Sequence, residues 1–120
     1  MNLPLITTTF RSEGGAASYS LVVRSSTEER EAVQAADGSV LILGVTTIVA
    51  ASDGQPMDVV RAGFADVRYG ATVTADDPLT ADANGDAVPA SAGDHIIGYA
   101  DMSGDVGDIG AVWINPGILA

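Results

Sequence analysis

The acidic string DANGD (residues 82–86) is the part of the sequence that most resembles a ligand-binding site. Its oxygen-bearing side chains stand at alternate positions, as they do at the start of a calcium-binding loop. An EF-hand loop also requires glycine at its sixth position and glutamate at its twelfth, where this sequence has Ala87 and Gly93. An Asn-Gly pair, by contrast, readily closes a β-hairpin because both residues tolerate positive φ. The sequence therefore predicts a β-turn at this place and no metal site.

Two other positions have side chains suited to acid–base chemistry. Asp76 and Asp77 are adjacent, but neighbouring residues of a strand point to opposite faces, and Asp77-Pro78 is typical of the start of a turn. His95, the one histidine, precedes an apolar run and is expected at the half-exposed start of a strand. The chain has no cysteine and no lysine, and it contains no GxSxG, GxxxxGK or HExxH motif. The sequence thus predicts no enzymatic activity, no catalytic residues and no cofactor.

The charge balance limits the partners that the chain can have. Its 120 residues include 16 acidic and 5 basic ones, which gives a formal net charge of −11 at pH 7. Such a chain repels phosphate, so we expect neither a nucleic acid nor an anionic membrane as a partner. No apolar run approaches the roughly 18 residues of a membrane span. The length fits one compact domain, whose role we expect to be contact rather than chemistry.

The elements that must position these residues have the pattern of short β-strands. β-branched residues favour pleated strands, and glycines favour turns. Turn signals such as Asp-Gly and Asn-Gly separate the apolar runs about every ten residues. The pattern predicts an all-β single domain, either a small barrel or a sandwich. The predicted strand segments are residues 18–23, 39–50, 57–74, 95–100 and 110–114.

Two apolar runs are candidates for contact between subunits. One, residues 40–43, is apolar on both faces of a strand, so we expect it in the centre of a sheet or beneath a partner chain. The other, residues 110–114, contains the single tryptophan, for which we expect packing in the core or at a subunit interface. The residues of this predicted interface are Val40, Leu41, Ile42, Leu43 and Trp113.

An internal repeat connects two parts of the sequence. Residues 31–46 resemble residues 86–100, with Val33 matching Val88 at a spacing of 55 residues. Helix propensity and a capping pattern favour a helix over residues 27–36, but the second copy has a proline where a helix interior would not accept one. We therefore predict that each copy forms an extended segment, a glycine turn and a buried strand. Chance similarity is the alternative for so short a match.

The N-terminal residues differ from the rest because residues 1–10 carry no charged side chain and are followed by a Gly-Gly pair. One interpretation is an extended arm, residues 1–16, that leaves a β-rich domain of residues 17–120 and adds as a strand to another protein's sheet. The other interpretation is the first edge strand of the domain itself. An uncharged arm would promote aggregation unless a partner covered it. The predicted contact residues of the arm are Leu3, Pro4, Leu5, Ile6, Thr7, Thr8, Thr9 and Phe10.

Residues 69–114 resemble the capsid cement, or head decoration, proteins of tailed phages and related viruses. The order and spacing of several short strings, rather than any single string, make the match specific. These strings are DPLTADANG (77–85), AVPA (87–90), GDHIIGYA (93–100) and GDIGAVWI (107–114), supported upstream by GVTT (44–47) and MDVVRAGFADVRYG (57–70).

The resemblance implies a small β-rich protein on the outer surface of an assembled capsid built from HK97-fold subunits. Such proteins commonly form trimers over three-fold or quasi-three-fold positions and clamp neighbouring capsomers against the pressure of packaged DNA. The expected partners are accordingly the major capsid protein, which the arm would contact, and further copies of the chain in a homotrimer. The expected location is the outside of the virion. The family has no catalytic residues to transfer to this sequence.

Two other functions stay open at this stage. The first is a surface-exposed module that binds a ligand, a glycan or a receptor without catalysis. Sugar sites usually present an exposed aromatic side chain beside polar ones, and the chain has only six aromatic residues. The second is a small hydrolase that uses the region of Asp76 and Asp77. Saturable binding to shells that lack the protein would favour the capsid function, whereas glycan binding or substrate turnover would favour one of the others.

Overall fold

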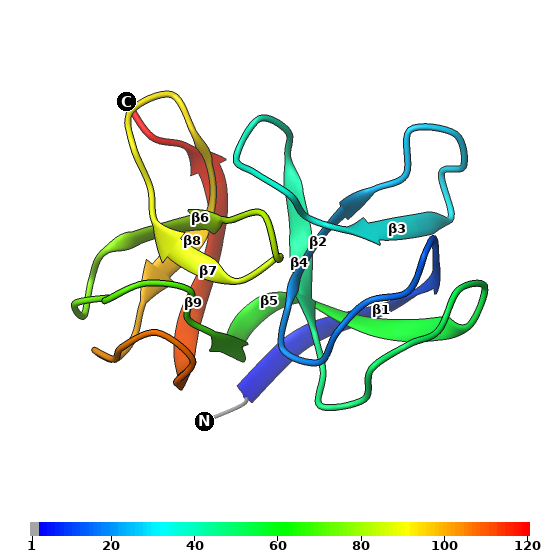
Figure 1. Cartoon of the computed structure of the whole chain (residues 1–120), viewed down its shortest axis with the longest axis horizontal. Helices are drawn as coiled ribbons and strands as arrows, with labels where there is room; N and C mark the ends of the chain where they lie inside the picture. The colour runs from blue at the N-terminus through cyan, green and yellow to red at the C-terminus, as the bar shows by residue number, and fades with distance from the viewer. Residues whose placement is uncertain (1–2) are drawn as a thin grey trace.

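The computed structural model describes residues 3–120, with side chains from Ile6 onward. Every regular element in this part of the chain is a β-strand, so the predicted all-β class is confirmed (Figure 1). None of the described residues belongs to a helix that would be long and apolar enough to cross a membrane. The strands are β1 (Leu3–Ser12), β2 (Leu21–Arg24), β3 (Glu31–Gln34), β4 (Ile42–Thr46), β5 (Pro56–Arg68), β6 (Pro78–Ala81), β7 (Ala87–Pro89), β8 (His95–Ala100) and β9 (Ile109–Ile118).

The strands form one sheet that closes on itself at one end. Their order is β1-β3-β2-β4-β5-β9-β8-β6-β7, and β1 also pairs with β5. This additional pairing closes β1 to β5 into a five-stranded barrel, because β1 contacts β3 along one edge and β5 along the other. Of the two architectures that the sequence left open, the structure has the barrel.

The N-terminal segment belongs to this barrel. β1 runs antiparallel to β5 and begins with Leu3 opposite Phe64. Gly14 and Gly15, the pair that follows the uncharged stretch, have positive φ and turn the chain out of β1 towards β2. The structure therefore places the described part of residues 1–12 inside the domain, as the edge-strand interpretation has it. The physical reason is that this uncharged, strand-forming run finds its hydrogen-bonding partner in β5 of the same chain.

The repeat predicted between residues 31–46 and 86–100 is present in the strand pairing. β2 pairs with β3 and β4, and β4 pairs with β5; in the same way β6 pairs with β7 and β8, and β8 pairs with β9. The sequence comparison matched Val33 with Val88. Val33 pairs with Val23, the middle of three paired residues of β2, and Val88 pairs with Thr80, the middle of three paired residues of β6. The similarity between the two segments is therefore one of register as well as of residue type.

The repeat also extends beyond the segments that the sequence comparison found. Ser12 in β1 lies parallel to Ala32 in β3, and Tyr69, just after β5, lies parallel to Ala87 in β7. We call β1 to β5 the first lobe and β5 to β9 the second lobe. Strand β5 belongs to both, because it pairs with β1 and β4 in the first lobe and with β9 in the second. The two lobes lie side by side in Figure 1.

Glycines stand at the same place in both lobes for the same reason. A Cβ atom on Gly44 in β4 would collide with the carbonyl oxygen of Val60 in β5, and one on Gly98 in β8 would collide with the carbonyl oxygen of Trp113 in β9. The ladder is irregular near both glycines. A side chain at either position would push two paired strands apart.

Residues 27–36, where helix propensity is high, contain a turn and strand β3 rather than a helix. An extended segment here gains backbone partners in β1 and β2. Tertiary pairing thus overrides local propensity, as the proline in the second copy of the repeat predicted.

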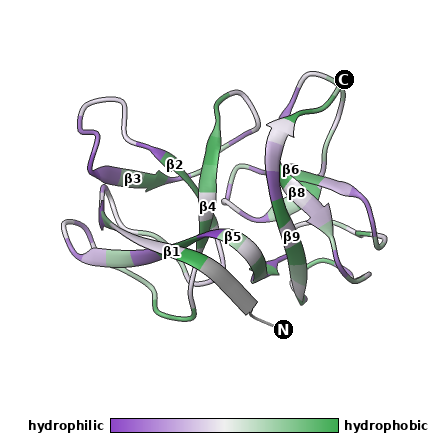
Figure 2. Cartoon of the chain, turned by 180° about the vertical axis from the view of Figure 1, so that it is seen from behind, coloured by the Kyte–Doolittle hydropathy of each residue, from purple (hydrophilic) through white to green (hydrophobic). Residues whose placement is uncertain are grey.

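Apolar packing joins the two lobes into one domain. The interior of the first lobe is a separate buried cluster around Phe10, Leu43 and Val59. A larger cluster fills the second lobe and also includes Val45 and Val60, which belong to strands of the first lobe. Strands β4 and β9 contact each other between the lobes; in Figure 2, β4 is coloured largely as hydrophobic, and so is the lower part of β9. This shared contact holds the lobes together.

Candidate functional site

Strand β1 presents an open sheet edge. One of its edges pairs with β5 along almost the whole strand, whereas the other pairs with β3 only at Arg11 and Ser12. Over residues 3–10 the structure therefore shows no strand on this second edge within the described part of the chain. Natural proteins usually protect such an edge with charges or cover it, and this stretch carries no charged residue.

The side chains of β1 divide between the interior and the surface. Ile6 is exposed over 55 % of its surface, and the Thr9 hydroxyl donates a hydrogen bond to Asp58. Phe10 is buried in the first lobe, with the guanidinium groups of Arg24 and Arg61 each 5.7 Å from its ring centre. Phe10 was predicted as a contact residue of the arm, but because it is buried within the chain it is not available to another protein. The side chains of the predicted contact residues Leu3, Pro4 and Leu5 lie outside the described part.

The five residues of the predicted subunit interface do not form one surface. Ile42 and Leu43 begin β4 and are buried within the chain, as expected for a central strand. Val40 and Leu41 precede β4 and expose about half of their surfaces, 49 % and 53 %. The strand begins late because Ser39 donates two hydrogen bonds to the Asp37 carboxylate in the preceding turn. Only part of the run is therefore available to a partner.

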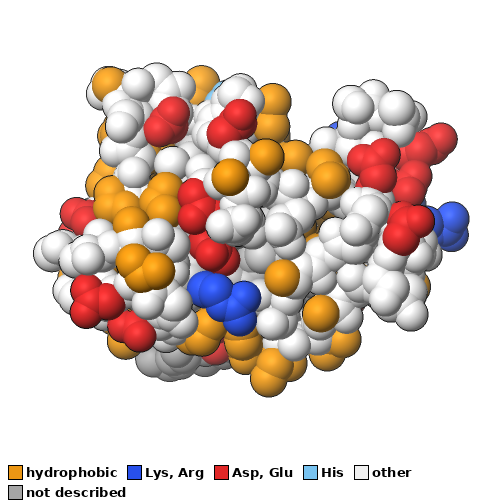
Figure 3. Space-filling model, in the orientation of Figure 1, with side chains coloured by type: hydrophobic (Ala, Val, Ile, Leu, Met, Phe, Trp, Pro, Cys, Tyr) orange, Lys and Arg blue, Asp and Glu red, His pale blue; other side chains and the backbone are white. Residues whose placement is uncertain are grey.

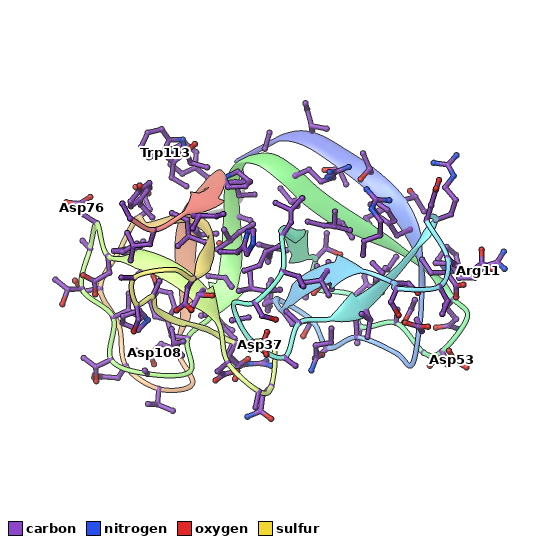
Figure 4. The ribbon with its side chains drawn as sticks, turned by 90° about the horizontal axis from the view of Figure 1, so that it is seen from above. Arg11, Asp37, Asp53, Asp76, Asp108 and Trp113 are labelled. Carbon is purple, nitrogen blue, oxygen red and sulfur yellow. The ribbon has the colours of Figure 1, made fainter. Side chains whose placement is uncertain are left out.

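Trp113 belongs to a row of aromatic side chains on the outside of the second lobe. It lies directly opposite Phe64 in β5 and directly opposite Tyr99 in β8. Residues directly opposite each other in antiparallel strands project to the same face. The rings of Tyr99 and Trp113 are 6.3 Å apart and tilted by 43°, a common geometry for an aromatic pair. Trp113 is 51 % exposed and points away from the ribbon (Figure 4).

Two members of this aromatic row, Phe64 and Tyr99, were not predicted from the sequence as surface residues beside Trp113. Phe64 and Tyr99 lie in predicted strands, but nothing in their own segments indicated that both would flank the tryptophan. The strand register that brings them together depends on pairing across β5, β9 and β8, which are distant in sequence. A signal was present only in the repeat, which makes Tyr99 and Trp113 the counterparts of Val45 and Val60.

The acidic string at residues 82–86 forms the turn that the sequence predicted. The Asp82 carboxylate accepts hydrogen bonds from the backbone N–H groups of Asn84 and Asp86, at 2.8 and 2.9 Å. The turn also binds the first lobe, since its Gly85 carbonyl accepts a hydrogen bond from Leu21 N–H at 2.8 Å. Within the described residues, no group of three or more acidic or histidine side chains is arranged to hold a metal ion.

The other acid–base candidates also have structural positions. The Asp77 carboxylate accepts a hydrogen bond from Thr74 N–H at 2.9 Å, which caps the turn before β6. Asp76 has a positive φ of 76° in that turn. His95 begins β8 half-buried, and its backbone N–H donates to the Gly38 carbonyl. These contacts give each of the three residues a structural role in a turn or at the start of a strand.

The shifted pKa values of two carboxyl groups have causes within the fold. Burial raises the pKa of Asp86, the nearby carboxylate of Asp82 raises it further, and Arg68 opposes both effects. The pKa of Asp37 is lowered by the hydrogen bonds that it accepts from Ser39. Both shifts therefore have local causes: partial burial for Asp86 and hydrogen bonds within a turn for Asp37.

Comparison with known proteins shows that the fold of this chain is similar to that of a solved phage structure. No family model matches the chain, and no curated protein matches it. Among solved structures, the chain is similar to the N base of the head fiber protein gp8.5 of bacteriophage phi29. The superposition has a TM-score of 0.75 and covers 96 % of this chain and 98 % of that chain, at 21 % sequence identity. The two chains thus share one fold over nearly their full lengths.

Proposed function

We propose that this chain is a structural protein of a phage head that binds the outside of the assembled shell as a trimer and stabilises it. The observation that carries the proposal is the match of the whole fold to the base of a phage head fiber. The resemblance of residues 69–114 to head decoration proteins, which rests on the order and spacing of several short strings, also supports it.

The open edge of β1 is the part of the surface that we assign to the shell. An extended segment of the major capsid protein can add to this edge as a further strand, so that backbone hydrogen bonds provide affinity. Ile6 would pack against that segment, because its side chain is exposed on the same strand. This is a revised form of the arm: β1 stays in the barrel through β5 and offers its second edge to the shell.

Binding of this kind stabilises the shell by mass action. A ligand that binds only the assembled, expanded shell shifts the equilibrium towards that state. A trimer engages three sites at once, so a modest affinity at each site gives persistent attachment. The net charge of −11 keeps the decorated surface from adhering to nucleic acid and to other acidic surfaces.

The proposal is tested by adding the purified protein to phage shells that lack it and measuring bound protein by co-sedimentation. The wild-type chain is expected to bind saturably to the outside of mature shells. Ile6→Lys places a charge on the open edge and should weaken binding at least about tenfold. Val106→Lys is the matched control, because Val106 is 70 % exposed in a turn of the second lobe, and it should bind as the wild type does.

Two results would count against the proposal. Absence of binding by the wild-type chain would remove the shell function altogether. Equal loss of binding by Ile6→Lys and Val106→Lys would leave the shell function but remove β1 as the contact. Circular dichroism of both variants distinguishes loss of binding from loss of folding.

A second candidate function is a glycan-binding module of the virion surface. The observation that favours it is the exposed ring of Trp113 beside Tyr99, since sugars stack on exposed aromatic side chains. Binding to a glycan array that Trp113→Ala abolishes, together with no binding to shells, would favour this function over the first.

A further inference from the structure

The outer face of the first lobe is buried inside the molecule. Leu21, Val45 and Val60 lie directly opposite one another in β2, β4 and β5, and none exposes more than 1 % of its surface. They belong to the same buried cluster as Ile97 and Ile114 of the second lobe. The second lobe therefore covers this face of the first.

The equivalent face of the second lobe has no such cover within the described part of the chain. Its counterparts to the three buried residues are Pro78, Tyr99 and Trp113, which lie directly opposite one another in β6, β8 and β9. Trp113 and Tyr99 are large and none of the three carries a charge, yet Trp113 is half exposed and Pro78 and Tyr99 are only partly buried. Phe64 extends the row on the other side of Trp113. An apolar row on a surface that stays in water is unfavourable, so the row indicates a face that becomes covered.

The row is also free of the charge that dominates the rest of the chain. Strand β9 and the two residues after it contain no charged side chain, whereas acidic side chains are spread over both lobes in Figure 3. Asp66 of β5, opposite Ala111, borders the row on the same face, but the row itself carries no charge. Interfaces between identical subunits are comparatively apolar, and aromatic residues are enriched in them.

We infer that the row formed by Phe64, Trp113 and Tyr99 is a contact surface between copies of this chain. It names the partner within the proposed trimer and rests on that proposal for the expectation that copies assemble. The repeat supports the surface itself, because the same face of the first lobe is covered by a lobe of this fold.

Two prolines distinguish this proposed contact from the contact between the lobes of one chain. In the first lobe, Leu21 N–H donates to the Gly85 carbonyl and the Gln34 side chain donates to the Asn84 carbonyl, at 2.8 Å each. The second lobe has proline at both equivalent positions, Pro78 and Pro89, which have no such donors. A further lobe therefore cannot add as the second lobe adds to the first. A closed ring of copies, joined through side chains, satisfies both observations.

The test is made on the purified protein without shells, so its failure and the failure of shell binding are distinguishable. Trp113 is the only tryptophan, so its fluorescence reports on this face alone. The wild-type chain should sediment as an oligomer, and its emission should shift to shorter wavelength as the oligomer forms with rising concentration. Tyr99→Thr keeps the tryptophan and a strand-forming residue, and it should weaken association at least about tenfold.

Val49→Thr is the matched control, because Val49 is 70 % exposed in the loop before β5, outside the row. It should associate and fluoresce as the wild type does, and circular dichroism should show that both variants are folded. A wild-type chain that stays monomeric at all concentrations, with unchanged emission, would overturn the inference. So would an oligomer whose Trp113 emission is that of an exposed ring and whose association Tyr99→Thr leaves intact.

Discussion

The two lobes share one strand pattern but fill it differently. In the first lobe Phe10 lies opposite Met57, and at the equivalent place in the second lobe Val67 lies opposite Gly110. The space that the smaller pair leaves is taken by the ring of Tyr69, which lies against Gly110. Its hydroxyl donates to the Met102 carbonyl at 2.6 Å. A duplicated backbone thus accepts different cores, provided that bulk lost from one strand is supplied by another.

The outer faces of the lobes differ in a second way. The face of the first lobe carries aliphatic residues and is covered by the second lobe, whereas the equivalent face of the second lobe carries aromatic ones and is open. The difference indicates which surface of the duplicated unit is used within the chain and which is left for a partner.

The largest expected effect comes from emptying the first lobe. Phe10→Ala removes the main side chain that attaches β1 to the barrel and should lower the free energy of unfolding by about 3–5 kcal/mol. Urea denaturation measures it. The equivalent change in the second lobe, Val67→Ala, removes a smaller buried group and should cost clearly less. If Phe10→Ala left the stability unchanged, β1 would not be part of the folded domain in solution.

Overfilling the second lobe should have the next largest effect. A Cβ atom on Gly110 would collide with the Tyr69 ring, so Gly110→Ala should cost about 1–3 kcal/mol. Gly117→Ala is the control in the same strand, because nothing lies within 4 Å of the added atom, and its melting temperature should be close to that of the wild type. Equal melting temperatures for the two variants would show that Tyr69 does not fill the space above Gly110.

A smaller effect is expected where the lobes join. The Gln34 side chain accepts a hydrogen bond from Ala17 N–H at 3.0 Å and donates one to the Asn84 carbonyl at 2.8 Å. Gln34→Ala should therefore cost about 1 kcal/mol in thermal unfolding. Gln55→Ala removes a hydrogen bond within one loop and should cost less. A larger loss for Gln55→Ala would indicate that the turn at residues 82–86 contributes little to the attachment of the lobes.

The smallest effect concerns pH. The pKa of Asp86 is raised above its ordinary value of 3.8, mainly by burial, so the folded state disfavours the charged form. Its contribution to stability therefore falls as pH rises through this range. Asp86→Asn should be slightly more stable than the wild type at pH 7. The gain should be at most about 0.5 kcal/mol, because the group is only partly buried and solvent screens its charge. The gain should vanish well below pH 3.8; a gain that persists there would have another cause.

Local signals predicted much of this structure from the sequence. β-branched residues between turn signals predicted a strand over residues 57–74, and β5 (Pro56–Arg68) occupies most of that stretch. The spacing between the two copies of the repeat predicted an extended β3 in place of a helix. Both signals depend on residues close in sequence or on a comparison of two segments.

The features that could not be predicted depend on long-range register. Nothing in the sequence of residues 3–10 indicates that their partner is β5, so the edge strand and the arm were equally compatible with the sequence. Alternation in β9 shows that Trp113 and Val112 face opposite sides, but not which side is covered. That distinction depends on where the second lobe packs, and only the full set of strand pairings specifies it.

The most direct test of the central claim is electron cryomicroscopy of phage shells that lack the protein and are then incubated with it. We predict density for this two-lobed fold on the outer surface at three-fold or quasi-three-fold positions. In it, β1 should face the shell and the aromatic row should lie between copies. Shells that stay bare at saturating protein concentration would contradict the account.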